Sequence, residues 1–190
     1  WERHSAHGVT EGYELTYQIF PVLGLEKASE MAEELGENDL AKRWKSVSKE
    51  IWNSFLNSPK YAMIEDGKLI KRRKSDGSWH KTFEPPDRSL LPDGTPLREE
   101  YYNPIDPDTS VALPIAFKMI DPKSNLSKRT LESLELLWNQ RWYNGGYGRY
   151  NIKSEPDSPG PWPFATMFVT RAYIENGNRD KVIRNLDWMI

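Results

Sequence analysis

The sequence predicts an all-α fold in which helical hairpins form part of a double-layered ring. Six stretches with helical periodicity follow one another along the chain. Stretches that are apolar around much of their circumference alternate with stretches that are apolar on one side only. Helices of the first kind are expected to be buried on all sides, and helices of the second kind are expected to cover them from outside. Three pairs of an inner and an outer helix are therefore predicted within a single domain that spans residues 1–190.

The first pair is expected over residues 9–35 and from Asn38 onward. Gly36 is suited to end the inner helix, and Pro21 is expected to kink it. Asn38 is the predicted N-cap of the outer helix, whose apolar side chains recur with a period of 3.6 residues. These side chains are Leu40, Trp44, Val47, Ile51 and Phe55.

The second and third pairs are predicted from cap and turn residues. Asp108 is expected to cap the inner helix of the second pair, and Ser127 its outer helix. Proline suits a first helical turn, so Pro161 and Trp162 are expected to open the third inner helix, which ends at Gly177. The last outer helix runs from Arg179 to the end. We expect Tyr17, Ile115 and Phe168 to lie on inner helices. We expect Trp44, Leu134 and Leu186 to lie on outer helices and to face inward.

An insertion over residues 58–103 separates the first two pairs. Residues 61–70 predict a β-hairpin that turns at Asp66-Gly67, while residues 75–103 are expected to be largely irregular. The basic run from Lys71 to Lys74 is interpreted as the solvated edge of a strand.

Composition excludes several classes of partner. Twenty-six Lys and Arg nearly balance 28 Asp and Glu, which gives no indication of nucleic-acid binding. No stretch approaches the roughly 20 apolar residues that a membrane span needs. The absence of cysteine excludes disulfides and thiolate metal sites, and three histidines leave little scope for a histidine site. No metal or cofactor is expected, and the compartment stays open, with the cytoplasm favoured.

Aromatic residues are frequent, with eight Trp and nine Tyr. Their flat apolar faces can stack on sugar rings while their polar tips form hydrogen bonds, although they can equally fill a core. The glycine-rich run from Gly145 to Gly148 leads into Arg149 and Tyr150, and Glu155, Asp157 and Trp162 follow. Glycine permits close approach and Arg offers a planar set of donors. The segment is either a polyol-binding loop or an ordinary connection.

The chain opens at Trp1-Glu2-Arg3, directly in a motif-like stretch and without Met, which suggests a fragment. An indole beside a carboxylate can desolvate it and raise its pKa, whereas an adjacent Arg can lower that pKa. By spacing alone, a surface Glu is the commoner interpretation.

Three segments resemble glycoside hydrolase family 15, the glucoamylases, glucodextranases and related trehalases. Trp1-Glu2 is similar to the family's Trp-Glu-Glu motif. The run Ile105-Asp106-Pro107-Asp108-Thr109-Ser110-Val111-Ala112-Leu113, followed by Phe117 and Asp121-Pro122, is similar to a helix and its Asp-Pro turn. The third segment extends from Gly148-Arg149-Tyr150 to Pro161-Trp162. The resemblance implies the C-terminal part of an (α/α)₆ toroid, or six-hairpin barrel, about half of which would be present here.

The family's activity is the inverting hydrolysis of α-glucosidic bonds in oligosaccharides and polysaccharides. The resemblance implies that Glu2 is the general acid and that Trp1, Arg3, Arg149, Tyr150 and Trp162 bind substrate, with Glu155 and Asp157 as further sugar contacts. Inversion needs a second carboxyl about 6.5–9.5 Å from the first. In the family this general base follows the last helix pair, which places it beyond Ile190, and the rest of the barrel would come from a separate segment or chain.

One departure from the family pattern concerns Arg3, which replaces a substrate-binding Glu. A non-catalytic helical toroid that binds carbohydrate or another ligand is therefore an alternative. A toroid of the terpene-cyclase or prenyltransferase type is a third possibility, prompted by Asp76-Gly77-Ser78-Trp79, which a plain hairpin turn also explains. Because loops that lead into inner helices of a ring emerge on one rim, we expect Glu2, Arg149 and Trp162 at the same end of the bundle.

Overall fold

The computed structural model describes residues 12–81, 106–139, 145–148 and 161–190. This part of the chain is mostly helical with small β-hairpins, which agrees with the predicted all-α class and its hairpin insertion. None of the helices in these ranges is long and apolar enough to cross a membrane. In chain order the elements are β1 (Tyr13–Glu14), α1 (Leu15–Glu34), α2 (Asn38–Asn57), β2 (Ile64–Glu65), β3 (Lys68–Leu69), β4 (Arg72–Arg73), the 3₁₀ helix η3 (Thr109–Ala112), α3 (Leu113–Ala116), α4 (Asn125–Leu134), the 3₁₀ helix η4 (Glu135–Leu137), α5 (Pro163–Asn176) and α6 (Arg179–Met189).

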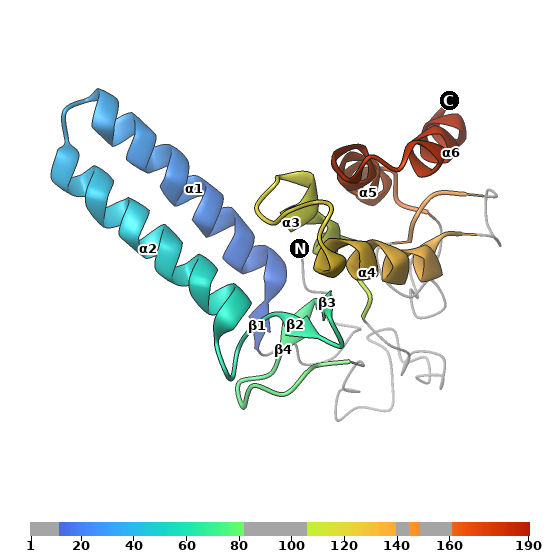
Figure 1. The fold of residues 1–190 in the computed structure, drawn as a ribbon, viewed down its shortest axis with the longest axis horizontal. Helices are drawn as coiled ribbons and strands as arrows, with labels where there is room; N and C mark the ends of the chain where they lie inside the picture. The colour runs from blue at the N-terminus through green and yellow to red at the C-terminus, as the bar shows by residue number, and fades with distance from the viewer. Residues whose placement is uncertain (1–11, 82–105, 140–144, 149–160) are drawn as a thin grey trace, which may run out of the picture.

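The helices form three successive groups in space (Figure 1). The long antiparallel hairpin of α1 and α2 lies on one side, α3 and α4 lie in the middle, and α5 and α6 pack together on the other side. Helix α3 contacts both α1 and α5. In Figure 1, α5 and α6 are seen nearly end-on while α1 and α2 lie in the plane, so the first pair crosses the last pair at a steep angle.

The middle of the molecule is the most deeply buried. All residues of η3 and α3 are buried, and Val111, Leu113 and Ile115 are fully inaccessible. Asp108 caps this segment as predicted, because its carboxylate accepts a hydrogen bond from the Ser110 amide at 2.8 Å. The helix is shorter than expected, since Lys118 adopts a left-handed φ of 57° that ends it after one α-helical turn.

The inward-facing predictions are confirmed only in part. Ile115 and Leu134 are fully buried, and Trp44 and Phe168 are half-buried. Leu186 is 42% exposed, so the prediction that it faces inward is wrong within the described part of the chain. Tyr17 lies on helix α1, and it is 55% exposed. Helix α1 has two apolar faces, and the face that carries Tyr17 is not the one that packs on α2 and α3.

Several helix ends differ from the sequence-based expectation by a few residues. Helix α1 starts at Leu15 rather than near residue 9, because the residues before it pair as strand β1 with β4. Ser124 caps α4 instead of Ser127, whose hydroxyl donates to the Asp121 carbonyl at 2.7 Å. The left-handed Gly177 ends α5 as predicted, and the first-turn proline of α5 is Pro163.

The predicted hairpin over residues 61–70 is confirmed. Strands β2 and β3 pair with Ile64 opposite Leu69, and the turn residues Asp66 and Gly67 both have positive φ, 49° and 71°. Asp-Gly suits a two-residue turn of this kind because both positions require a left-handed backbone. Residues 75–81 contain a second turn and a bridge between Arg73 and Trp79, whereas residues 82–103 of the insertion lie outside the described ranges.

The basic run forms strand β4, but its interpretation as a solvated edge is wrong for three of its four residues. Lys71, Arg72 and Arg73 are 4%, 8% and 6% exposed. Lys71 Nζ lies 2.7 Å from Asp108 Oδ2, and Arg72 pairs with Glu14. Arg73 donates to the Ile64 carbonyl of the hairpin and to the Gly77 carbonyl of the following turn. These pairs connect the insertion to the start of α1 and to the loop before η3.

Candidate functional site

Most of the predicted site residues lie outside the described ranges. These are Trp1, Glu2, Arg3, Arg149, Tyr150, Glu155 and Asp157. Trp162 lies within the described ranges. It is half-buried and immediately precedes α5. The expectation that Glu2, Arg149 and Trp162 share one end of the bundle therefore stays a prediction.

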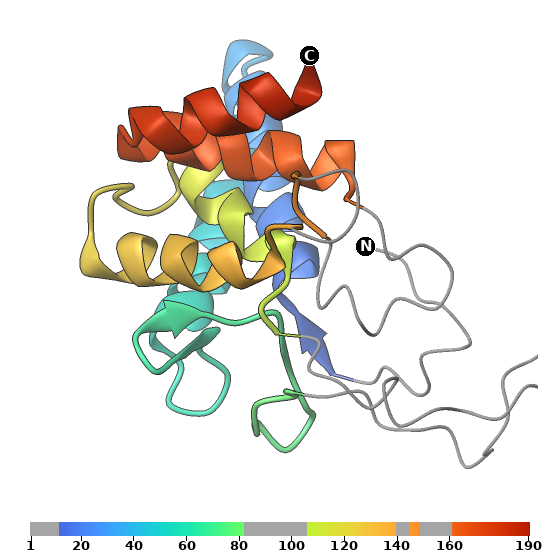
Figure 2. The ribbon, with the colours of Figure 1, turned by 90° about the vertical axis from the view of Figure 1, so that its right-hand side faces the viewer.

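The segments that lead into α1, η3 and α5 all lie on the right-hand side in Figure 2. Five side chains from these segments each have a buried nitrogen or oxygen atom without a hydrogen-bond partner among the described residues. We call them the helix-start cluster: Glu14 (Oε1), Thr16 (Oγ1), Asp106 (Oδ1), Ser110 (Oγ) and Trp162 (Nε1). A buried polar atom without a partner costs about 1–3 kcal/mol, so five such atoms at corresponding places in three helices are typical of a binding site.

Strand β4 brings two of these segments together. Glu14 lies opposite Arg72 in the β1–β4 pair and forms an ion pair with it. The carbonyl of Lys71 accepts a hydrogen bond from the Leu15 amide at 2.8 Å, while its ammonium group binds Asp108. The start of α1 and the loop before η3 are thereby attached to consecutive residues, Arg72 in β4 and Lys71 immediately before it.

The surroundings of Asp106 alter the pKa of its carboxyl. Its Oδ2 accepts a hydrogen bond from the indole Nε1 of Trp79 at 2.7 Å, and its side chain lies close to Lys68. Burial raises the pKa of Asp106 to about 6, although the Trp79 hydrogen bond and Lys68 act in the opposite direction.

The chemistry of the helix-start cluster suits a neutral polyhydroxylated ligand. The carboxyl oxygens accept hydrogen bonds, the Thr and Ser hydroxyls both donate and accept, and the indole only donates. A sugar hydroxyl can match each of these groups. Among the described residues, no group of three His, Cys, Asp or Glu side chains could hold a metal ion.

A second arrangement holds the backbone immediately before Arg149. The Asn139 amide donates to the Gly146 carbonyl, the Gly148 amide to the Leu137 carbonyl and the Trp162 amide to the Tyr147 carbonyl, at 2.8–2.9 Å. Gly145 is required in this loop, because an added Cβ would lie 2.4 Å from the indole of Trp188. The loop therefore has one defined position between η4, α5 and α6.

Glu135 is the electrostatic centre of this arrangement. Its carboxylate accepts hydrogen bonds from the hydroxyls of Tyr147 and Tyr173, each at 2.6 Å, and forms ion pairs with Lys181 and Arg184. The Arg184 guanidinium lies 3.6 Å from the ring centroid of Trp138. Burial acts to raise the pKa of Glu135, but these donors outweigh it and lower the pKa to about 2.

Replacing Glu135 with Gln is expected to destabilise the fold in a pH-dependent way. The pKa is lower in the folded state than in the unfolded state, so the charge contributes stability above about pH 4.5 that is lost as the pH falls toward 2. Chemical unfolding of the full-length protein should show Glu135→Gln less stable by up to about 3 kcal/mol at pH 7. The difference should shrink at pH 3, and an equal difference at both pH values would contradict the assignment.

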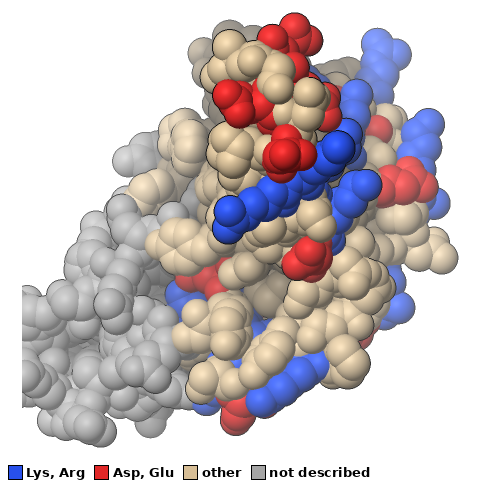
Figure 3. Space-filling view, turned by 90° about the vertical axis from the view of Figure 1, so that its left-hand side faces the viewer, with Lys and Arg blue, Asp and Glu red and all other residues tan. Residues whose placement is uncertain are grey.

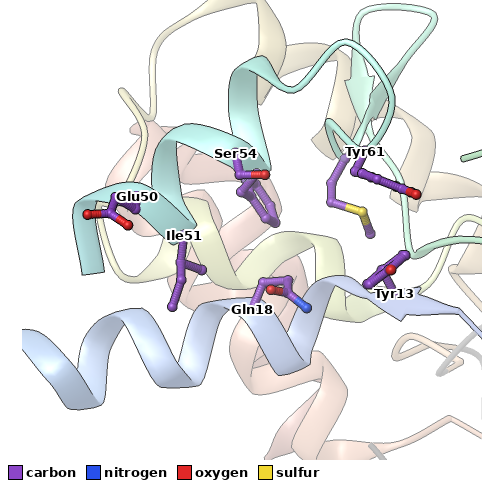
Figure 4. Close-up of a pocket in the computed structure, with 8 residues that line it drawn as sticks. Tyr13, Gln18, Glu50, Ile51, Ser54 and Tyr61 are labelled. Carbon is purple, nitrogen blue, oxygen red and sulfur yellow. The ribbon is translucent and has the colours of Figure 1, made fainter. Parts of the chain in front are cut away.

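A separate pocket of about 350 Å³ lies between α1, the end of α2 and the hairpin (Figure 4). Phe55 and Met63 form its buried apolar floor, and the rings of Tyr13 and Tyr61 meet edge-on with centroids 4.8 Å apart. Side chains alternate along a strand, so Tyr13 and Glu14 point to opposite faces of β1. The pocket is thus distinct from the helix-start cluster.

On the face shown in Figure 3, acidic and basic side chains are interspersed.

Sequence reasoning did not single out Glu14, Thr16 or Ser110, and it treated Asp106 only as part of a motif. One signal was available for Glu14 and Thr16, which interrupt an apolar stretch at the start of helix α1 and are both buried. A carboxylate at such a place is expected to have a cationic partner. Arg72, which supplies it, is 58 residues away in the sequence.

Comparison of the chain with protein-family models, with curated proteins and with solved structures finds no match. The resemblance to family 15 accordingly stays a prediction from the sequence motifs.

Proposed function

We propose that the chain is part of a glycoside hydrolase that cleaves α-glucosidic bonds in oligosaccharides or polysaccharides with inversion of configuration. The observation that supports this proposal is the helix-start cluster, whose buried acceptors and donors have the mixed character that a neutral sugar needs. The family 15 resemblance of the sequence supplies the linkage type and the stereochemistry.

Under this proposal Glu2 protonates the leaving oxygen, and a carboxylate beyond residue 190 activates water. Arg149, Tyr150, Glu155 and Asp157 contact sugar hydroxyls. Trp162 offers its ring for stacking, and its Nε1, which has no partner among the described residues, is available as a donor to a hydroxyl.

The toroid is proposed on the basis of uncovered apolar faces. The middle inner helix α3 is covered on all sides, whereas α1 and α5 each leave one apolar face exposed. The exposed side chains are Tyr17, Phe20 and Met31 on α1, and Phe164, Met167 and Ile174 on α5. Further hairpins of an (α/α)₆ toroid, from a separate segment or chain, would cover these faces.

The reaction itself tests the proposal. The full-length protein should hydrolyse at least one of maltose, isomaltose and trehalose, and proton NMR should detect β-glucose as the first product. Release of α-glucose would contradict inversion. Binding of these sugars without hydrolysis would favour the alternative of a non-catalytic carbohydrate-binding protein.

Thr16→Val and Ser110→Ala are expected to make the protein more stable and less active. Each removes a buried hydroxyl whose oxygen has no partner within the described ranges, so the free energy of unfolding should rise by about 1 kcal/mol. If the hydroxyls bind substrate, KM should rise in the same variants. Thermal unfolding and steady-state kinetics on one preparation measure both effects, and a loss of stability would show that the hydroxyls serve the fold.

A further inference from the structure

We propose that Glu14 and Asp106 act as a pair of carboxyls that bind neighbouring hydroxyl groups of the substrate sugar. This inference rests on the proposed function and adds a subsite whose residues carry no predicted role. Its basis is the common arrangement of the two side chains and their attachment to consecutive residues.

Both carboxyls have one oxygen occupied and one available. In Glu14, Oε2 is held by Arg72, and in Asp106, Oδ2 is held by the Trp79 indole at 2.7 Å. The second oxygen of each, Oε1 and Oδ1, has no hydrogen-bond partner among the described residues. The side chains are only 5% and 8% exposed, so bulk water does not compensate for the missing bonds. Glu14 is therefore oriented by Arg72, and Asp106 by Trp79 and the Lys71 backbone, while one oxygen of each carboxyl lacks a donor among the described residues.

The two carboxyls are attached to consecutive residues. Arg72 pairs with Glu14, and the backbone of the preceding residue, Lys71, bonds to Leu15 and to Asp106. This common attachment is the basis for assigning both carboxyls to one sugar ring.

The charges around the pair favour a neutral ligand over an anionic one. The cations of these two residues are already engaged, since Lys71 is paired with Asp108 and Arg72 with Glu14. An anionic ligand would be repelled by two carboxyls whose nearby cations, Arg72 and Lys68, already interact with them, whereas a hydroxyl donates directly to a carboxylate oxygen. Burial raises the pKa of Asp106, so one more hydrogen-bond donor would stabilise its charged form.

The test combines site variants with sugars that lack single hydroxyls. We would measure kcat/KM of the full-length enzyme for maltose and its monodeoxy analogues, with the wild type, Asp106→Asn and Glu14→Gln. Each variant should lower kcat/KM for maltose by about 10–100-fold, mainly through KM, as expected for a hydrogen bond to a charged group. For each carboxyl, one deoxy sugar should be impaired with the wild type and show little further loss with the variant.

Asp76→Asn is the matched control, because Asp76 lies in the insertion that supplies Arg72 and Trp79, but is exposed and hydrogen-bonds only to Ser78 among the described residues. Asp76→Asn should leave kcat/KM unchanged for maltose and for each deoxy analogue. Both site variants keep an acceptor for Trp79 or Arg72, and thermal unfolding verifies their fold. If Glu14→Gln does not fold, the comparison of Asp106→Asn with the wild type on maltose and its deoxy analogues tests the proposal.

The outcomes separate this inference from the function on which it rests. In one outcome, the wild type cleaves maltose while the loss of kcat/KM in each variant adds fully to the loss caused by every deoxy sugar. This result overturns the carboxyl pair and leaves the proposed glycosidase function intact. A wild-type protein that neither binds nor cleaves any of the glucosides overturns both.

Discussion

Replacing Glu2 with Gln in the full-length enzyme is expected to lower kcat for maltose by about 10²–10⁴-fold, the range that general acid assistance contributes. Glutamine retains the size of the side chain but cannot protonate the leaving glycosidic oxygen. KM should change little, because the lost interaction belongs to the transition state. Steady-state kinetics at the optimum pH of the wild type measure both values.

A substrate that needs no protonation provides the control. Fluoride leaves without an acid, so α-glucosyl fluoride should be cleaved by Glu2→Gln with a much smaller loss than maltose. Equal losses on the two substrates would show that Glu2 has a role other than general acid. Glu155→Gln, at a proposed sugar contact, should instead act mainly on KM.

Replacing Lys71 with Met is expected to destabilise the protein by about 3–5 kcal/mol, the range for removal of one partner of a buried ion pair. Lys71 and Asp108 have side chains that are 5% and 0% exposed, so the change leaves a carboxylate buried without its cation. Urea unfolding of the full-length protein at pH 7 measures the loss. The double variant Lys71→Met/Asp108→Asn should regain part of it, since the uncompensated charge is then removed.

Lys27→Met is the matched control for this prediction. Lys27 pairs with Glu30 on the surface of α1, where the two side chains are 73% and 61% exposed. Exposed pairs contribute about 0–1 kcal/mol, so this variant should unfold almost like the wild type. If Lys71→Met lowered the free energy of unfolding by an equally small amount, a structural role for the buried pair would be contradicted.

The features that the sequence predicted correctly depend on neighbouring residues. Asp66-Gly67 determines its turn through the left-handed backbone of two adjacent positions, and Asp108 caps η3 by bonding to an amide two residues away. Gly177 ends α5 for a similarly local reason. In each case the interacting groups lie within a few positions of one another, so a residue pattern is sufficient.

The features that were missed depend on distant residues. Lys71 and Asp108 are 37 positions apart, and Arg72 and Glu14 are 58 apart. A run of four cations resembles a solvated strand edge until the partners are known. The same limit applies to the candidate site, because the unpartnered oxygens of Glu14 and Asp106 become recognisable only when burial and hydrogen bonds are known together. The motif residues other than Trp162 lie outside the described ranges.

The contact between Trp188 and the glycine loop joins α6 to the residues before Arg149. The indole occupies the space that a side chain at Gly145 or Gly146 would need. A larger residue at either position would therefore disturb the packing of the outer helix as well as the loop, although the two segments are about 40 positions apart in the sequence.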